Sequence, residues 1–376
     1  MANSEEMREI LLHGDYTKVI NKRTSVELHT AMREGKAKAN RSRITLVGPG
    51  RAGKTCVARS FLDKQFKDTP STQGIDDMGL WTDIYKAEAR ERGRIPKVGG
   101  EKGVEIMENE GLDPLVSVLD LGGSEVFEVL QSFILIPNGV YLVVFDMKWM
   151  QQSDEKDDKV GKLWCLERLE SWLYKLVVQT SVPDRDNQLK CSSIALVGTH
   201  KDEVPDAEIH REISNELQKL LSSSIAWRSL LEYETEDGQR LCFFPVDCTK
   251  GQADPTMVNL MTAIETDILI SDYVNVERPL SYFKVLDEIN ERKKTVSYLS
   301  LDEVSEIMKK NEMKDVLMED MLRFFTQLGA VLWFEESSLR NMVVLERMYV
   351  EPFTTTTCCS VVHNLLIIPL TNNSPS

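Results

Sequence analysis

The sequence has little of what marks secreted, metal-binding or membrane proteins. Its seven cysteines among 376 residues form no C-x-x-C pair and have no histidine partner at zinc-binding spacing, which argues against a zinc site and fits reduced thiols in the cytosol. No signal peptide or spanning helix is visible. The longest late apolar stretch, 361–370, is interrupted by His363 and Asn364 and is too short to cross a bilayer. We therefore expect a cytoplasmic protein.

Positive charge is also in short supply. The chain has 45 Lys and Arg against 60 Asp and Glu, which gives a formal net charge of −15. Such a balance argues against nucleic acid as the main ligand. No internal repeat is visible. What the chain does have is apolar content: with 42% hydrophobic residues, a chain of 376 residues is long enough for about two domains with real cores.

The most informative segment is 48–55, GPGRAGKT, which completes the pattern G-x-x-x-x-G-K-[ST] directly after the apolar run 44–47. In such a loop the glycines let backbone amides turn toward phosphate oxygens, the lysine reaches the β and γ phosphates, and the threonine hydroxyl holds Mg²⁺. A helix starting near Gly53 would add its positive dipole end. The residues predicted to bind nucleotide here are Gly48, Pro49, Gly50, Arg51, Ala52, Gly53, Lys54, Thr55 and Cys56. The alternative, an idle glycine-rich turn, is disfavoured by the strand-then-helix context.

A second element with phosphate chemistry follows the apolar run 115–119. It has the D-x-x-G pattern from Asp120 to Gly123, in which the carboxylate is predicted to act on Mg²⁺ through water and the glycine amide to touch the γ phosphate. Upstream, Thr72 offers a hydroxyl and a carbonyl to the same metal. Loss of the γ phosphate would release both segments, as in an order-to-disorder switch. Each pattern alone is common in ordinary turns. We assign Lys54, Thr72 and Gly123 as catalytic residues, and Thr55, Thr72 and Asp120 as metal ligands.

Base recognition is assigned to two later loops. The apolar run 193–198 is typical of a buried parallel strand, and nucleotides bind at the carboxyl ends of such strands. The tetrapeptide THKD follows it, and the Asp202 carboxylate can accept both the ring N–H and the exocyclic amine of guanine, which adenine does not offer. A further predicted strand, 241–246, precedes DCTKG. The residues predicted on the base side are Thr199, His200, Lys201, Asp202, Cys248, Thr249 and Lys250. Taken alone, THKD is also compatible with a solvated loop.

Together, GPGRAGKT, TQGID, DLGGSE, THKD and DCTKG resemble the Roc domain, the Ras-like GTPase of the Roco family, in which T-H-x-D commonly stands where other Ras-like proteins have N-K-x-D. The stretch 278–334 is similar to the start of the COR domain that accompanies Roc. The resemblance covers about residues 40–350. It implies a signalling GTPase that binds GTP and GDP with Mg²⁺. It also implies self-association as a homodimer through COR, which truncation of the COR domain would weaken.

Three features depart from the family pattern. His200 stands where many GTPases have a lysine whose stem packs on the base, and Ser124 replaces the glutamine that orients the attacking water. A charged segment at about 77–114 is inserted before the D-x-x-G strand; a partner-binding surface and a solvated loop are both open for it. We predict a GTP-binding molecular switch with slow Mg²⁺-dependent hydrolysis. The alternatives are a nucleotide-gated scaffold with negligible turnover and an ATP-using P-loop protein.

The order of apolar runs predicts the fold. Strands alternate with helices up to residue 276, which is typical of a doubly wound α/β domain of the P-loop GTPase class. A smaller helical, winged-helix-like module is expected after it, closed by a hairpin of 330–334 with 342–345. An edge strand is predicted over 80–87. The predicted helices are 125–136, 160–179, 207–221, 255–270, 301–310 and 313–328.

The predicted domains are a helical lead-in over 1–40, a Roc-like GTPase domain over 41–276, a partial COR-like module over 277–350 and a non-matching, disordered tail over 351–376. Since a complete COR domain would run well beyond Tyr349, the sequence looks like a fragment. On that interpretation, the helices of the module would expose part of the apolar face that should be buried, and contiguous exposed apolar surface favours association.

Overall fold

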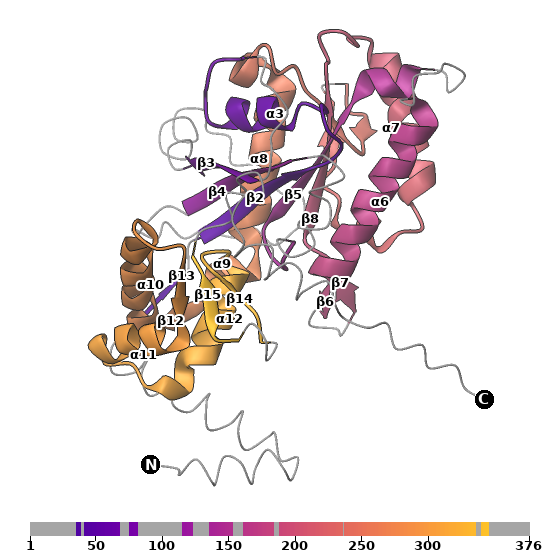
Figure 1. The fold of residues 1–376 in the computed structure, drawn as a ribbon. Helices are drawn as coiled ribbons and strands as arrows, with labels where there is room; N and C mark the ends of the chain where they lie inside the picture. The colour runs from indigo at the N-terminus through magenta and orange to yellow at the C-terminus, as the bar shows by residue number, and fades with distance from the viewer. Residues whose placement is uncertain are drawn as a thin grey trace, which may run out of the picture.

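The computed structural model describes residues 35–38, 41–67, 75–81, 115–122, 135–152, 161–183, 188–235, 237–335 and 340–345. At its centre lies a six-stranded sheet with the order β11-β8-β5-β2-β4-β3 (Figure 1). Its strands are β2 Arg41–Val47, β3 Ile75–Trp81, β4 Leu115–Leu121, β5 Val140–Asp146, β8 Ser193–Thr199 and β11 Phe244–Pro245. Neighbouring strands are parallel, except that the edge strand β3 runs antiparallel to β4.

Helices cover both faces of this sheet (Figure 1). They are α3 Lys54–Phe61, α6 Lys162–Thr180, α7 Ala207–Leu221, α8 Pro255–Ile270 and the short α9 Asp272–Asn275. Three 3₁₀ turns accompany them: η1 Met147–Gln151, η2 Ile225–Ser229 and η3 Gly251–Ala253. The doubly wound α/β fold predicted from the sequence is therefore confirmed.

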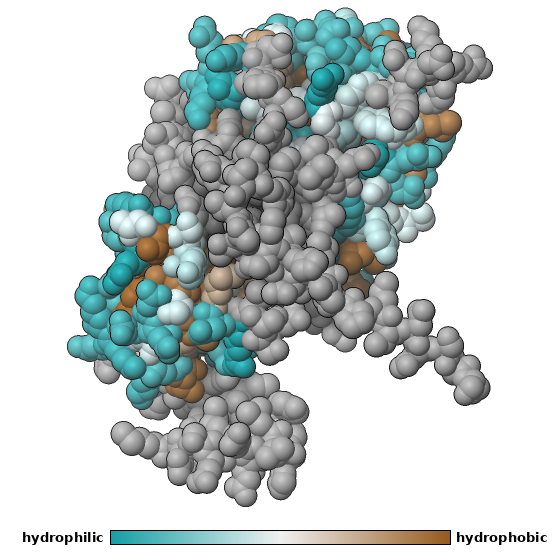
Figure 2. Space-filling view, viewed as in Figure 1, coloured by the Kyte–Doolittle hydropathy of each residue, from teal (hydrophilic) through white to brown (hydrophobic). Residues whose placement is uncertain are grey.

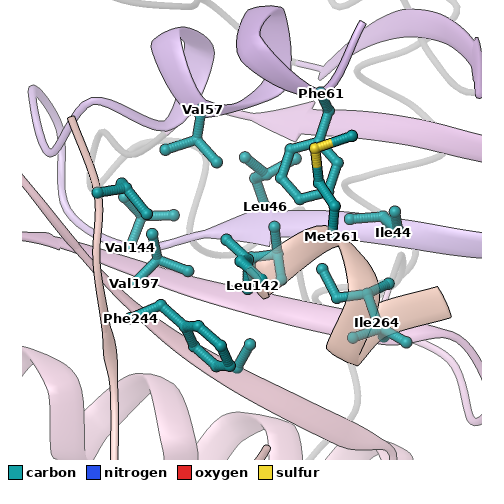
Figure 3. Packing of buried hydrophobic residues seen from close by; sticks show 14 of the residues in the cluster. Ile44, Leu46, Val57, Phe61, Leu142, Val144, Val197, Phe244, Met261 and Ile264 are labelled. Atoms are coloured by element: carbon teal, nitrogen blue, oxygen red, sulfur yellow. The ribbon is translucent and has the colours of Figure 1, made fainter. Parts of the chain in front are cut away.

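The sheet separates two hydrophobic cores. Because successive side chains of a strand point to opposite faces, β5 supplies Leu142 and Val144 to a core shared with α3 and α8, and Tyr141 and Val143 to a core shared with α6 and α7. Figure 3 shows part of the first core, where Leu142 of the sheet lies near residues of α3 and α8. All seven residues of β5 are buried, as expected for a nearly continuous apolar strand in a parallel sheet.

Most predicted elements match the observed ones, and the exceptions have local causes. The helices predicted over 207–221 and 255–270 have the bounds of α7 and α8. The strand predicted over 241–246 is instead split into β10 Arg240–Leu241, which pairs with β9 Tyr233–Glu234, and β11. The chain bends at Cys242 and Phe243, so that β10 pairs with β9 while β11 pairs with β8.

Other predictions fall partly or wholly outside the described residues. The edge strand expected over 80–87 is β3, which begins earlier and ends at Trp81. The rest of the charged insertion, the lead-in up to residue 34 and the tail 351–376 lie outside the described residues. Most of the helix predicted over 125–136 does too. A small hairpin of β6 Val182–Pro183 with β7 Leu189–Lys190 follows α6.

The C-terminal module has the element order of a winged-helix-like fold. Its helices are α10 Leu280–Lys293, α11 Leu301–Lys310 and α12 Met318–Gln327, with the 3₁₀ turn η4 Asp315–Leu317. Its sheet has the order β13-β15-β14, formed by β13 Tyr298–Ser300, β14 Leu332–Trp333 and β15 Met342–Val344. The pairing of β14 with β15 confirms the predicted hairpin, whereas the third strand β13 was not predicted.

The expectation that this module exposes an apolar face is wrong for the described residues. Ile307 of α11 and Leu322 and Phe325 of α12 are at most 3% exposed, and they pack with α10 and β15 in one core. On the face drawn in Figure 2, hydrophilic residues dominate this part of the surface and hydrophobic ones form separate spots. The short sheet and α10 cover the helices, so the module closes a core of its own.

The two parts of the chain meet at a two-stranded antiparallel ladder. β1 Lys36–Lys38, just before β2, pairs with β12 Glu277–Pro279, just before α10. The Leu280 amide donates a hydrogen bond to the Gly35 carbonyl oxygen at 3.2 Å. The entry to the first domain and the entry to the module are thus held side by side. None of the helices within the described ranges is long and apolar enough to span a bilayer.

Candidate functional site

The parallel strands β2, β4, β5, β8 and β11 end at the same edge of the sheet, which is where ligands bind in open α/β folds. The loop 48–53 follows β2, the loop 199–204 includes the end of β8, and the loop 247–250 comes after β11. Asp120 is the next-to-last residue of β4. The structure therefore gathers the described candidate residues at one edge. Thr72, Gly123 and Ser124 lie outside the described residues.

The loop 48–53 needs glycine at two positions. Gly48 has a φ of +134°, and a Cβ there would lie 2.3 Å from the carbonyl oxygen of Val144 in β5. Gly53 has a φ of +85° and is the N-cap residue of α3, where a Cβ would lie 3.0 Å from Thr199 Cγ2. Arg51 also has a positive φ of 64° and its side chain is exposed. Glycine at these two positions lets the loop curl closely over the ends of β5 and β8.

Lys54 is buried inside this curl. Its Nζ donates hydrogen bonds to the carbonyl oxygens of Gly48 and Pro49, at 3.0 and 2.7 Å. The residue is 6% exposed. Burial lowers the pKa of its ammonium group to about 8, although the nearby Asp120 carboxylate favours the charged form. A positive group is thus held at the centre of the loop by two neutral carbonyls.

Thr55 and Asp120 form the next contact. The Thr55 hydroxyl donates to Asp120 Oδ2 at 2.5 Å, and Asp120 is fully buried. The pair combines a hydroxyl and a carboxylate, the hard oxygen ligands that Mg²⁺ prefers. No group of three or more His, Cys, Asp or Glu side chains with metal-binding geometry occurs within the described residues.

The loop 199–204 packs on the loop 48–53. The Thr199 hydroxyl lies 2.8 Å from the Ala52 carbonyl oxygen. His200 has a φ of 62°, and its Nδ1 lies 3.0 Å from Thr199 Oγ1 and 3.3 Å from Asp146 Oδ1 at the end of β5. Asp202 is exposed. Thr199 and His200 therefore anchor the loop, and the carboxylate two residues later is presented to solvent.

The loop 247–250 is ordered around a buried carboxylate. Asp247 Oδ1 accepts hydrogen bonds from the Thr249 amide and hydroxyl, and Asp247 Oδ2 lies 2.9 Å from Lys250 Nζ. Burial opposes ionisation, but these donors hold the pKa of Asp247 below its ordinary value. The bond to Asp247, with a contribution from the charge of Asp202, raises the pKa of Lys250. Cys248 is 8% exposed and its side chain belongs to the core, where burial raises the pKa of its thiol.

Asp254, which was not singled out from the sequence, joins these loops. It is 2% exposed. Its carboxylate accepts from Lys201 Nζ at 2.8 Å and from the Asp247 amide at 2.9 Å. It also caps α8, where the Thr256 amide donates to it. The signal in the sequence was Asp254-Pro255, since an aspartate before proline is typical of a helix start.

Comparisons with known proteins agree with this architecture. Residues 279–352 match the family model "C-terminal of Roc, COR-A domain". The chain is 21% identical over 331 residues to the probable serine/threonine-protein kinase pats1 of Dictyostelium discoideum, a match that covers 84% of this chain but 9% of that protein. The chain therefore spans about a tenth of the length of this relative.

A solved structure, that of Methanosarcina barkeri Roco2 RocCORdC bound to GDP, has a similar fold. Its TM-score is 0.55 at 20% sequence identity, and the match covers 84% of this chain and 75% of that one. The chain therefore carries a match to the COR-A family over residues 279–352, after a P-loop-type α/β domain, and shares the fold of the Roco2 RocCORdC structure.

Proposed function

We propose that the chain is a GTP-binding molecular switch with slow Mg²⁺-dependent hydrolysis. The observation that carries the proposal is the contact of three elements at one sheet edge: the Lys54-centred loop, the Thr55–Asp120 pair and the loop that presents Asp202. The similar Roco2 structure is bound to GDP, which supports a guanine nucleotide as the ligand.

The phosphate and metal roles follow from the donor set. The amides of 48–53 and the Lys54 ammonium would hold phosphate oxygens, because the loop curls around a buried cation. The Thr55 hydroxyl would hold Mg²⁺ directly and Asp120 through water. When bound, Mg²⁺ neutralises phosphate charge. Thr72 and Gly123 would respond to the γ phosphate, which is how this family of folds switches between two states.

The base would lie against the loops 199–204 and 247–250. The Asp202 carboxylate would accept the two guanine N–H donors, and its charge contributes to the raised pKa of Lys250 in the neighbouring loop. His200 is held by Asp146, so its ring is positioned at the end of β5 beside the Thr199 anchor. A pocket that pairs a carboxylate with guanine leaves that charge unpaired when adenine enters, which is the basis of selectivity.

Nucleotide choice can be tested directly. We expect the unaltered protein to bind GTP and GDP much more tightly than ATP, and Asp202→Asn to weaken GTP binding by about 1 to 3 kcal/mol, the cost of losing a charge-assisted pair. Isothermal titration calorimetry measures both. The matched control is Glu203→Gln, whose exposed carboxylate pairs with Lys148 and should change the dissociation constant by no more than about fivefold. Equal affinity of the unaltered protein for GTP and ATP would defeat the proposal.

Turnover is the second test. Because Ser124 stands where Ras-like enzymes have the water-orienting glutamine, intrinsic hydrolysis is expected at or below about 10⁻⁴ s⁻¹. Single-turnover assays with GTP and ATP separate the three candidate functions. Slow GTP loss supports the switch, and stable GTP binding without loss supports a nucleotide-gated scaffold. Preferential loss of ATP supports an ATP-using P-loop protein. A rate near 1 s⁻¹ without a partner would point to a catalytic group in this chain that the sequence does not reveal.

A further inference from the structure

The side chain of Lys201 is used inside the protein. Its Nζ donates to Asp254 Oδ1 at 2.8 Å and to Thr256 Oγ1 at 2.7 Å. Lys201 is 26% exposed and Asp254 is 3% exposed at the side chain. Lys201 directly precedes Asp202, the exposed carboxylate proposed to recognise guanine. The contacts of the Lys201 side chain therefore constrain the backbone from which Asp202 projects.

Asp254, the partner of Lys201, is itself held by two backbone amides. Its Oδ2 accepts the Asp247 amide at 2.9 Å, and its Oδ1 accepts the Thr256 amide at 3.4 Å in the first turn of α8. The positive end of the α8 dipole favours a carboxylate at this position. The buried Asp254 carboxylate thus connects two loops to the start of α8. It holds the loop 199–204 through a side chain and the loop 247–250 through a backbone amide.

Backbone bonds align the same two loops. The Val246 amide donates to the Gly198 carbonyl oxygen at 2.8 Å, and the Lys201 amide donates to the Val246 carbonyl oxygen at 3.3 Å. The second of these bonds is long, and it is the last one before Asp202. The ion pair of Lys201 with Asp254 therefore adds a second connection at the residue whose backbone hydrogen bond is long.

We propose that Lys201 and Asp254 are positioning residues that set guanine selectivity by holding Asp202 in place. The inference rests on the proposed function. A carboxylate that accepts two parallel N–H donors needs its geometry fixed, because a small displacement loses one bond of the pair. Lys201 and Asp254 do not touch the base in this scheme. They act through the backbone of Asp202.

The test compares GDP with inosine diphosphate, which lacks the exocyclic amine that Asp202 would accept. Dissociation constants are measured for the unaltered protein, Lys201→Met, Lys201→Arg, Asp254→Asn and the double variant Lys201→Met with Asp254→Asn. Lys201→Met should reduce the preference for GDP over inosine diphosphate by about tenfold, the loss of one hydrogen bond to a charged group. Lys201→Arg keeps the charge and should retain most of the preference. The double variant should lose little more than either single change.

The matched control is Lys162→Met, since Lys162 also pairs with a carboxylate, Glu216, in a partly exposed contact between α6 and α7. It should leave the preference unchanged. If Lys201 has a merely structural role, Lys201→Met should weaken the binding of GDP and of inosine diphosphate by the same factor. That result overturns the inference but leaves the proposed function standing. If Lys201→Met does not fold, the inference is tested with Asp254→Asn and Lys201→Arg, using the same ratio of the dissociation constants for inosine diphosphate and GDP. An unaltered protein that does not prefer GDP to inosine diphosphate overturns both the inference and the proposed role of Asp202.

Discussion

At the residue scale, Lys54 makes nucleotide binding depend on pH. Burial lowers its pKa to about 8, and phosphate beside it would raise that pKa again. Binding above pH 8 would therefore take up a proton, so we expect GDP affinity to fall as pH rises from about 8 to 9, by up to about tenfold per pH unit. Calorimetry in buffers of different ionisation enthalpy measures the uptake. Lys54→Arg is the control, because arginine does not titrate in this range.

The same group affects the stability of the nucleotide-free protein. The folded-state pKa, about 8, lies below the ordinary value of 10.5, so the unfolded chain binds more protons between these limits. The free energy of unfolding should therefore rise with pH from about 8 to 10.5. Urea titrations at several pH values check this, and Lys54→Met should remove that part of the rise. The assignment would be contradicted if the free energy of unfolding of the unaltered protein fell over this interval and Lys54→Met abolished that fall.

Gly48 offers a steric test of the same loop. A Cβ at this position would lie 2.3 Å from a backbone oxygen of β5, at a φ of +134°. Gly48→Ala should therefore cost at least about 3 kcal/mol of stability and abolish nucleotide binding. Gly238→Ala is the matched control, since Gly238 has a φ of +79° with nothing within 4 Å of the added Cβ. It should cost only about 1 kcal/mol, and equal losses in denaturant titrations would count against the clash.

At the element scale, α11 depends on its N-terminal cap. The Ser300 hydroxyl accepts from the Glu303 amide, and the Glu303 carboxylate accepts from the Ser300 amide. Ser300→Ala should cost about 1 kcal/mol of module stability. Glu303→Ala should have a smaller effect, and the double variant should lose less than the sum because the two groups serve one cap. Glu306→Ala, at an exposed position of the same helix, should be nearly neutral. Additive losses in urea titrations would show that the two halves act separately.

At the scale of the whole molecule, the described residues form separate cores. The clusters on the two faces of the large sheet share no buried residue with the cluster of the C-terminal module. We therefore expect two thermal transitions in scanning calorimetry, of which GDP raises only the one that belongs to the first domain, since a ligand stabilises the unit it binds. Phe325→Ala, in the module core, should lower only the other. A single transition that moves as a whole with GDP would show that the β1–β12 ladder couples the two parts tightly.

The sequence alone was enough for features that neighbouring residues decide. The continuous apolar run of β5, the capped and periodic segments of α7 and α8, and the glycines of 48–53 all express local requirements of burial, periodicity and backbone angle. From these features the doubly wound fold could be predicted, and with it the placement of most candidate site residues at one edge of the sheet. The match of the predicted bounds with those of α7 and α8 reflects the clear start signals Asp206 and Asp254.

Only the tertiary structure decided what depends on residues far apart in the chain. Strands of two or three residues, such as those of the β1–β12 ladder and β13, have too little local pattern to be predicted. The same holds for Lys201, whose ammonium group finds Asp254 because β8 and β11 end side by side. The module's apolar helix faces are covered by α10 and β15 rather than exposed. In each case the partner is set by which surfaces packing brings together, and a local pattern carries no information about that.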